Sequence, residues 1–179
     1  MVHVYCGDGK GKTTAAIGLA VRAAGYNLPV LFVQFLKDDS SSEINCLKQL
    51  KSVQLLHAQI DYGFVSNMTE EQFAQTKAYY TGMLHETENW LKQIFDVNKT
   101  KEVCGVVVFD EVIHALNSGL LAEESFLELI EKYEDSIEFV LTGRNPSDTI
   151  KSKADYISMI QKIKHPFDHG VVARKGIEY

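Results

Sequence analysis

The stretch Val4-Tyr5-Cys6-Gly7-Asp8-Gly9-Lys10-Gly11-Lys12-Thr13-Thr14 predicts a β-strand, then a glycine-rich loop, then the start of a helix. Glycine has no Cβ, so the loop amides can approach an anion closely. Lys12 adds a positive charge, the Thr13 hydroxyl can bind a metal ion, and the helix points its positive dipole end at the same place. We therefore expect these residues to hold the polyphosphate of a nucleotide: Gly7, Asp8, Gly9, Lys10, Gly11, Lys12, Thr13 and Thr14.

This loop departs from the standard phosphate-loop pattern at one position. The pattern places a glycine six residues before the lysine, and Cys6 stands there in this chain. The second half, 11–14, is intact, and Gly7 and Gly9 supply flexibility just after the missing glycine. The alternative interpretation is a glycine-rich strand-to-helix turn with surface lysines and no ligand.

The composition indicates an ordinary globular protein. The chain has 179 residues, 45% of them hydrophobic and 23% charged, which fits one domain over residues 1–179. A net charge of −6 argues against a broad nucleic-acid surface, and no apolar run is long enough to cross a membrane. The first residues already read as a strand, leaving no room for a signal peptide. An odd number of distant cysteines favours a reducing cytoplasm over a disulfide framework or a zinc site (Cys6, Cys46, Cys104).

Predicted strands and helices alternate along the chain. This order predicts an α/β fold with a doubly wound, mainly parallel sheet, of the phosphate-loop NTPase-like (RecA-like) kind. Ligands of such sheets bind beyond the carboxyl ends of the strands. We expect strands at 2–5, 30–33, 53–57, 103–110, 137–142 and 156–163, and helices at 13–24, 44–51, 69–95, around 114, at 122–132 and at 147–152.

Two carboxylates follow the apolar run Val106-Val107-Val108-Phe109. Asp110 and Glu111 should emerge at the ligand edge of the sheet, where one of them can hold Mg²⁺ beside the phosphates and Thr13. The spacing does not decide which of the two binds the metal. Solvated acids at a strand end are the alternative.

Other polar residues have weaker claims on the site. Arg144 follows another apolar strand and could bind phosphate or ribose, or it could be a turn arginine in water. For His114, just past the acidic pair, we expect a packed or surface position rather than a catalytic role. His165 and His169 have a helical metal-ligand spacing, but Pro166 breaks the helix that this spacing requires, so a structural turn is favoured.

Taken together, these motifs make the chain resemble the phosphate-loop family of ATP:corrinoid adenosyltransferases of the cobalamin-synthesis type. The blocks that carry the resemblance span the chain in the family's order: 7–16, Val33-Gln34-Phe35-Leu36-Lys37, Phe109-Asp110-Glu111, Thr142-Gly143-Arg144, His165-Pro166-Phe167-Asp168 and Gly176-Ile177-Glu178-Tyr179.

The resemblance implies a transfer reaction rather than phosphate cleavage. Family members move the 5′-deoxyadenosyl group of ATP to the Co(I) of a reduced corrinoid and release triphosphate. No protein nucleophile is then needed, because the corrinoid brings its own. Residues 7–14 would hold the triphosphate with Lys12 supporting catalysis, Thr13 and Glu111 would share Mg²⁺, Asp110 would shape that metal site, and Arg144 would be a weaker nucleotide contact.

The corrinoid side of the site shows two departures from the family. Phe64 matches the first residue of an aromatic pair that excludes water below the corrin ring, but Ser66 stands where a tryptophan is common. Tyr62 or Phe73 could fill the gap, or the reduction step differs. The chain also begins at its first strand, without the segment that covers the corrinoid in some members. We therefore expect a more open pocket, closed by a partner subunit or by the loop 37–43.

The resemblance further implies a homodimer and a reductase or flavin reductant, with no nucleic-acid or membrane partner. Two other functions stay open from the sequence. A phosphate-loop kinase or ATPase would cleave the γ-phosphate, and a regulatory module would bind ATP without consuming it.

Overall fold

The computed structural model describes residues 1–37, 41–57, 63, 65–97 and 103–177. It contains one six-stranded sheet, and every strand pair is parallel, in the order β3-β2-β4-β5-β1-β6. This arrangement confirms the predicted α/β class. The strands are β1 (Val2–Cys6), β2 (Val30–Gln34), β3 (Val53–His57), β4 (Gly105–Asp110), β5 (Ile137–Gly143) and β6 (Tyr156–Met159).

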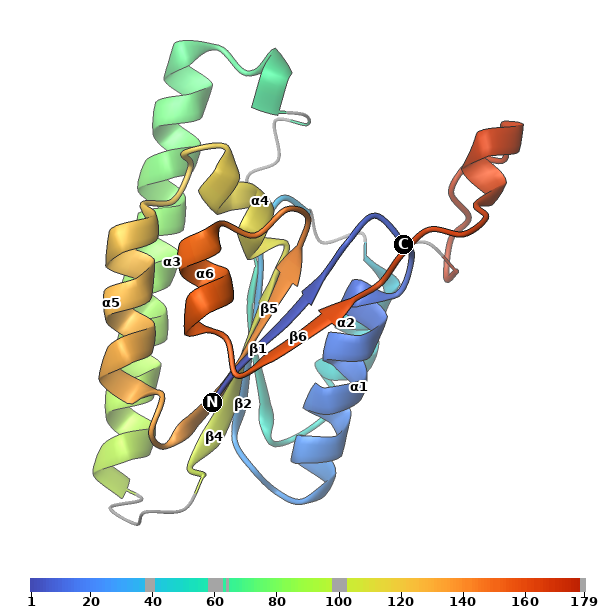
Figure 1. Ribbon diagram of the computed structural model, residues 1–179. Helices are drawn as coiled ribbons and strands as arrows, with labels where there is room; N and C mark the ends of the chain where they lie inside the picture. Colours follow the sequence, from blue (N-terminus) through green and yellow to red (C-terminus); the bar gives the residue numbers. More distant parts are fainter. Residues whose placement is uncertain (38–40, 58–62, 64, 98–102, 178–179) are drawn as a thin grey trace.

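Helices cover both faces of the sheet (Figure 1). Helices α1 (Lys12–Gly25) and α2 (Ser42–Leu47) lie on one face, and the others lie on the opposite face. Among the described residues, no helix is both long and apolar enough to cross a bilayer. The helices of the second face are α3 (Glu70–Val97), α4 (Val112–Asn117), α5 (Glu123–Tyr133) and α6 (Asp148–Lys153), and two short 3₁₀ turns cover Val65–Asn67 and Pro166–His169.

The central strands β2 and β4 are buried along their whole length. Burial on both faces explains why they read as unbroken apolar runs rather than as alternating patterns. Their register pairs Val33 with Phe109 and Gln34 with Asp110, so the two strands end side by side. The polar residues that end these strands therefore meet at one edge of the sheet.

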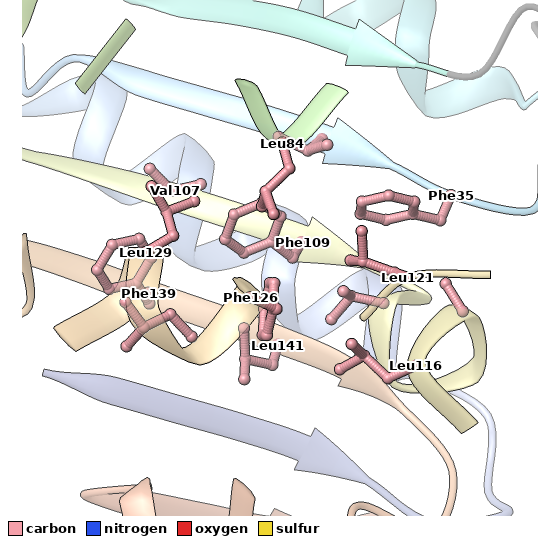
Figure 2. Packing of buried hydrophobic residues seen from close by; sticks show 14 of the residues in the cluster. Phe35, Leu84, Val107, Phe109, Leu116, Leu121, Phe126, Leu129, Phe139 and Leu141 are labelled. Carbon is pink, nitrogen blue, oxygen red and sulfur yellow. The ribbon is translucent and has the colours of Figure 1, made fainter. Parts of the chain in front are cut away.

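Aromatic rings pack among aliphatic side chains in the larger core, under α3 and α5 (Figure 2). The Phe109 ring centroid lies 5.0 Å from that of Phe126, 6.2 Å from Phe139 and 6.4 Å from Phe35. All four side chains are fully buried. Truncating one such ring to alanine typically costs about 3–5 kcal/mol. The smaller core under α1 is lined by Ala16, Ala20 and Ala23, whose small side chains let the helix lie close to the sheet.

The last strand is shorter than the sequence suggests. β6 ends at Met159, not at Ile163 as predicted, because its neighbour β1 ends at Cys6. Beyond that point the Ile160 amide still donates to the Cys6 carbonyl at 2.8 Å, and the chain then follows the glycine-rich loop instead of a strand. The apolar pattern of 156–163 therefore belongs partly to a strand and partly to a segment that supports the loop.

Helix α1 ends at Gly25, the residue predicted as its stop, and helix α2 differs from expectation. The left-handed residue after the end of α1 is not the glycine but Asn27, with φ 61°. Asparagine tolerates this conformation better than most residues with a Cβ. α2 begins at Ser42 and ends at Leu47, so Ser42 and Glu43 are helical rather than part of a loop.

The start of α3 confirms the predicted capping box. The Gln72 side chain accepts from the Thr69 amide at 2.9 Å, and the Thr69 hydroxyl accepts from the Gln72 amide at 3.2 Å. These two bonds satisfy donors that a helix start leaves unpaired.

Candidate nucleotide and metal site

A pocket of about 460 Å³ lies where the glycine-rich loop enters α1. One wall is the loop and the first helical turn, and the opposite wall comes from the ends of β2 and β4, from α2 and from the carboxyl-terminal segment. Its lining residues are Lys10, Gly11, Lys12, Thr13, Thr14, Ile17, Lys37, Ser42, Glu43, Cys46, Glu111, Gly176 and Ile177.

The first half of the loop packs against the chain that follows β6. A Cβ at Gly7 would lie 2.3 Å from the Ile160 carbonyl oxygen, and one at Gly9 would lie 2.8 Å from the same atom. The Gly9 amide donates to that carbonyl at 2.8 Å, so this amide is already used. These two glycines therefore allow backbone to approach backbone, and they do not line the pocket.

Asp8 belongs to the same contact. Its Oδ1 accepts from the Lys162 amide at 2.9 Å, and this hydrogen bond is the main reason that the pKa of Asp8 is lowered. Asp8 therefore fastens the loop to the segment after β6.

The second half of the loop opens onto the pocket. Gly11 has φ 117°, a conformation that side chains rarely adopt, although a Cβ there would meet nothing within 4 Å. The first amides of α1 follow at Lys12, Thr13 and Thr14, and a helix has no internal acceptor for such amides. They are available to an anion in the pocket.

Lys12 is buried, with 8% of its surface exposed, and its Nζ donates to the Gly9 carbonyl at 2.9 Å. Burial is the main cause that lowers the pKa of Lys12, and the positive charge of Arg144 adds to it, while Glu111 and Asp110 oppose it. An anionic ligand would restore the charge balance around this ammonium.

Asp110 is the hydrogen-bonded centre of the site and is fully buried. Its Oδ1 accepts from the hydroxyls of Thr13 and Thr142, each at 2.8 Å. Its Oδ2 accepts from Gln34 Nε2 at 3.2 Å and from Lys37 Nζ at 2.9 Å. A carboxylate buried this completely needs such partners, since an unpaired one would be very costly.

Lys37 supplies the positive charge for that carboxylate. Its Nζ also lies 3.4 Å from Thr13 Oγ1 and 3.7 Å from Glu43 Oε1. Burial alone would lower the pKa of Lys37, but the attraction and hydrogen bond of Asp110, helped by Glu43 and Glu111, outweigh it, so the pKa is raised.

Glu111 sits at the turn between β4 and α4 in a left-handed conformation, with φ 60°. Its amide donates to the Thr142 hydroxyl at 2.8 Å, and the residue lines the pocket. The same threonine thus holds Asp110 and Glu111 in one arrangement. This contact from β5 fixes the two acidic residues relative to each other.

The oxygen donors present suit a magnesium ion. The hydroxyl of Thr13 and the carboxylates of Asp110 and Glu111 are the hard ligands that Mg²⁺ prefers. Next to Asp110, the buried Gln34 Oε1 has no hydrogen-bond partner, and a metal-bound water nearby would provide one. The Lys37 ammonium already places a positive charge beside the Asp110 carboxylate. No preformed cluster of three or more histidine, cysteine or acidic side chains occurs within the described part of the chain, so water and phosphate oxygens would have to complete the coordination.

Arg144 is exposed and is not among the residues that line the pocket. Its carbonyl accepts from Asn117 Nδ2 at 3.0 Å, which fixes the turn after β5. Its charge nevertheless contributes to the lowered pKa values of Lys12 and Asp8, so it lies within electrostatic reach of the loop.

Some of the remaining residues singled out from the sequence lie in the part of the chain that the structure describes, and others lie outside it. His165 Nδ1 accepts from the Phe167 amide at 3.2 Å, which is the structural turn that the sequence favours, and His114 is exposed on α4. Phe73 packs against the larger core. Phe64 and Tyr62, like the end of the last family block at 178–179, lie outside the described residues.

The sequence reasoning missed four contributors to this site. In the sequence, Gln34 and Lys37 belong to a family motif without an assigned role, Thr142 has no predicted role, and the segment 160–162 is predicted as strand. A usable signal existed for the first three, because each is a polar residue at or just beyond the carboxyl end of a buried strand.

Comparison with solved structures agrees with the fold. The chain matches a KaiC-like protein of Pyrococcus horikoshii with a TM-score of 0.52 and 15% identity, covering 91% of this chain and 73% of that one. At this identity the likeness concerns the fold alone, which is the phosphate-loop NTPase-like, RecA-like α/β architecture.

Comparison with curated sequences gives closer relatives. The chain is 30% identical to the corrinoid adenosyltransferase CobA of Salmonella typhimurium over 179 residues, which is all of this chain and 85% of that protein. It is 28% identical to a corrinoid adenosyltransferase of Pseudomonas aeruginosa over 176 residues, covering 98% of this chain and 82% of the relative. The family model "ATP:corrinoid adenosyltransferase BtuR/CobO/CobP" matches residues 1–179, and the chain therefore belongs to the ATP:corrinoid adenosyltransferase family.

Proposed function

We propose that this protein transfers the 5′-deoxyadenosyl group of ATP to the Co(I) of a corrinoid and releases triphosphate, in the synthesis or salvage of adenosylcobalamin. The observation that carries the proposal is the pocket at residues 10–14, faced by Glu111, in a chain that matches this enzyme family along its whole length.

This reaction depends on stabilising the departing triphosphate and not on a catalytic base of the protein. The electron pair of Co(I) forms the Co–C5′ bond, and the C5′–O electron pair departs with the triphosphate. Negative charge therefore grows on the phosphates. The first amides of α1 and the Lys12 ammonium would stabilise that charge, and fixed donors of this kind are each typically worth about 3–4 kcal/mol in a transition state.

We propose that Thr13 and Glu111 hold Mg²⁺, with Asp110 shaping the site through its hydrogen bonds to Thr13 and Thr142. The ion would neutralise part of the phosphate charge. The remaining roles are also proposals: residues 10–14 hold the triphosphate, with Gly7, Asp8 and Gly9 supporting the loop from the side of Ile160 and Lys162. Arg144 contributes a long-range positive charge, and Phe64 contacts the corrinoid.

We further propose that residues 1–179 form one adenosyltransferase domain, that it works as a homodimer in the cytoplasm, and that a reductase or flavin supplies the electron that makes Co(I). The edge strand β6 supports a dimer, because its four residues are all exposed and include Ile157 and Met159.

The test combines the protein with MgATP and chemically reduced cobalamin. We expect the corrinoid absorption spectrum to change to that of an alkylcobalamin while inorganic triphosphate accumulates in equal amount. The Lys12→Ala variant should lose this activity, and Lys132→Ala, on the distant exposed surface of α5, should keep it. Release of orthophosphate and ADP would instead favour a kinase or ATPase, and binding of ATP without turnover would favour a regulatory module.

A further inference from the structure

Lys37 lies three residues beyond the end of β2, after a turn whose backbone is held in place by other residues. The preceding Leu36 adopts a left-handed conformation, with φ 55°, which is rare for a residue with a branched side chain. The Tyr80 hydroxyl of α3 accepts from the Leu36 amide at 2.9 Å and holds this turn. The turn carries the chain from the end of β2 into the pocket that Lys37 lines.

The Lys37 ammonium contacts the proposed metal ligand Thr13 and the carboxylate of Asp110 that shapes the metal site. It lies 2.9 Å from Asp110 Oδ2 and 3.4 Å from Thr13 Oγ1. Asp110 is fully buried, whereas the Lys37 side chain keeps 29% of its surface exposed and so has room to move. The ammonium and a divalent ion would repel each other strongly at such a short separation. The ammonium and the divalent ion therefore cannot lie beside Asp110 and Thr13 at the same time.

We propose that Lys37 is an exchangeable counter-ion of Asp110, which holds the cation position in the empty enzyme and is displaced when the metal–nucleotide complex binds. The displaced ammonium then turns to the triphosphate, which offers it a new anionic partner in the same pocket. This inference rests on the proposed metal site and concerns how that site is loaded.

The exchange has a thermodynamic consequence. A metal ion alone must expel Lys37 without giving the ammonium a new partner, so it binds weakly. With ATP present, the triphosphate accepts the ammonium, so metal and nucleotide bind cooperatively. Such a coupling is reciprocal, and ATP binding gains from the metal by the same factor.

The test measures binding of Mn²⁺, a paramagnetic substitute for Mg²⁺, by the loss of the free-ion electron paramagnetic resonance signal. Lys37→Gln removes the charge but keeps an N–H donor for Asp110, which protects folding. Without nucleotide, we expect this variant to bind Mn²⁺ at least about 10-fold more tightly than the wild type, within the usual range of such couplings. Its affinity gain for Mn²⁺ on adding ATP should shrink by a similar factor.

The matched control is Lys132→Gln, which changes the net charge equally but alters contacts on the exposed surface of α5, the pair with Glu88 and the cation–π contact with Tyr133. It should bind Mn²⁺ as the wild type does. Equal Mn²⁺ affinity in wild type and Lys37→Gln, an unchanged coupling with ATP, or the same tightening in Lys132→Gln would each overturn the proposal. Because no corrinoid is present, the outcome is independent of whether triphosphate is the product of turnover.

Discussion

At the scale of single residues, the glycines of the loop serve two different purposes. Gly7 and Gly9 make room for the Ile160 and Gln161 backbone, whereas Gly11 has open space around it and is needed only for its positive φ. The glycine spacing that suggests phosphate binding is thus partly a requirement of packing. We therefore propose that Gly11 and the amides that follow it bind the anion.

This difference predicts unequal effects of alanine at the two positive-φ positions. Gly11→Ala should lower the free energy of unfolding by about 1–3 kcal/mol, the usual cost of a strained backbone. Gly7→Ala should cost more, because its Cβ would also clash with a backbone carbonyl that cannot rotate away. Urea unfolding followed by circular dichroism measures both.

Gly82 in the middle of α3 provides the control. A Cβ there meets nothing within 4 Å and the φ is ordinary, so Gly82→Ala should stabilise the protein by about 0.5–1 kcal/mol. A Gly7→Ala variant no less stable than Gly11→Ala would contradict the packing argument.

At the scale of elements, the carboxyl ends of neighbouring strands supply the residues of the site. β4 brings Asp110 and Glu111 to the pocket, β5 brings Thr142 to hold both, and β2 leads through the strained turn at Leu36 to Lys37. The long helix α3 supports this edge from behind, since its Tyr80 fixes the Leu36 amide. The capping box of α3 therefore stabilises an element on which the site depends.

Thr69→Ala removes one bond of that capping box. The loss should lower the free energy of unfolding by about 1 kcal/mol, the typical value for an N-terminal cap. The matched control is Thr81→Ala in the exposed middle of the same helix, where the hydroxyl only bonds back to the Lys77 carbonyl. That change should be neutral or slightly stabilising. Chemical denaturation of both variants tests this, and an equal loss in both would argue against the cap.

At the scale of the whole molecule, the proposed nucleotide pocket joins parts of the chain that are far apart in sequence. Its wall includes Lys10 near the start, Glu111 in the middle and Ile177 near the end. The unfolded chain has no such pocket, so a ligand that binds here binds only the folded state and should stabilise the fold as a whole.

MgATP at about 100 times its dissociation constant should add about 2.7 kcal/mol to the stability of the wild type. In a domain of this size that corresponds to a rise in Tm of roughly 5–10 °C. Lys12→Ala should lose most of this shift because its ammonium lines the pocket, whereas Lys132→Ala should retain it. Differential scanning fluorimetry with and without MgATP makes the measurement. A full shift in Lys12→Ala would remove Lys12 from the binding site.

Much of this protein could be predicted from the sequence because the signals are local. The buried strands β2 and β4 appear as continuous apolar runs, the loop and the start of α1 appear in consecutive residues, and the Thr69–Gln72 cap needs only a three-residue spacing. The order of these elements along the chain was enough to give the α/β class, and the motifs were enough to give the family.

The sequence by itself therefore determined the parallel α/β architecture, the nucleotide loop and the acidic pair at 110–111. Only the tertiary structure decided that Gly7 and Gly9 support Ile160, that Thr142 holds the acidic pair, and that Lys37 neutralises Asp110. The physical reason is that these contacts join residues from separate strands. Their proximity depends on the strand order β3-β2-β4-β5-β1-β6, which no local pattern in the sequence encodes.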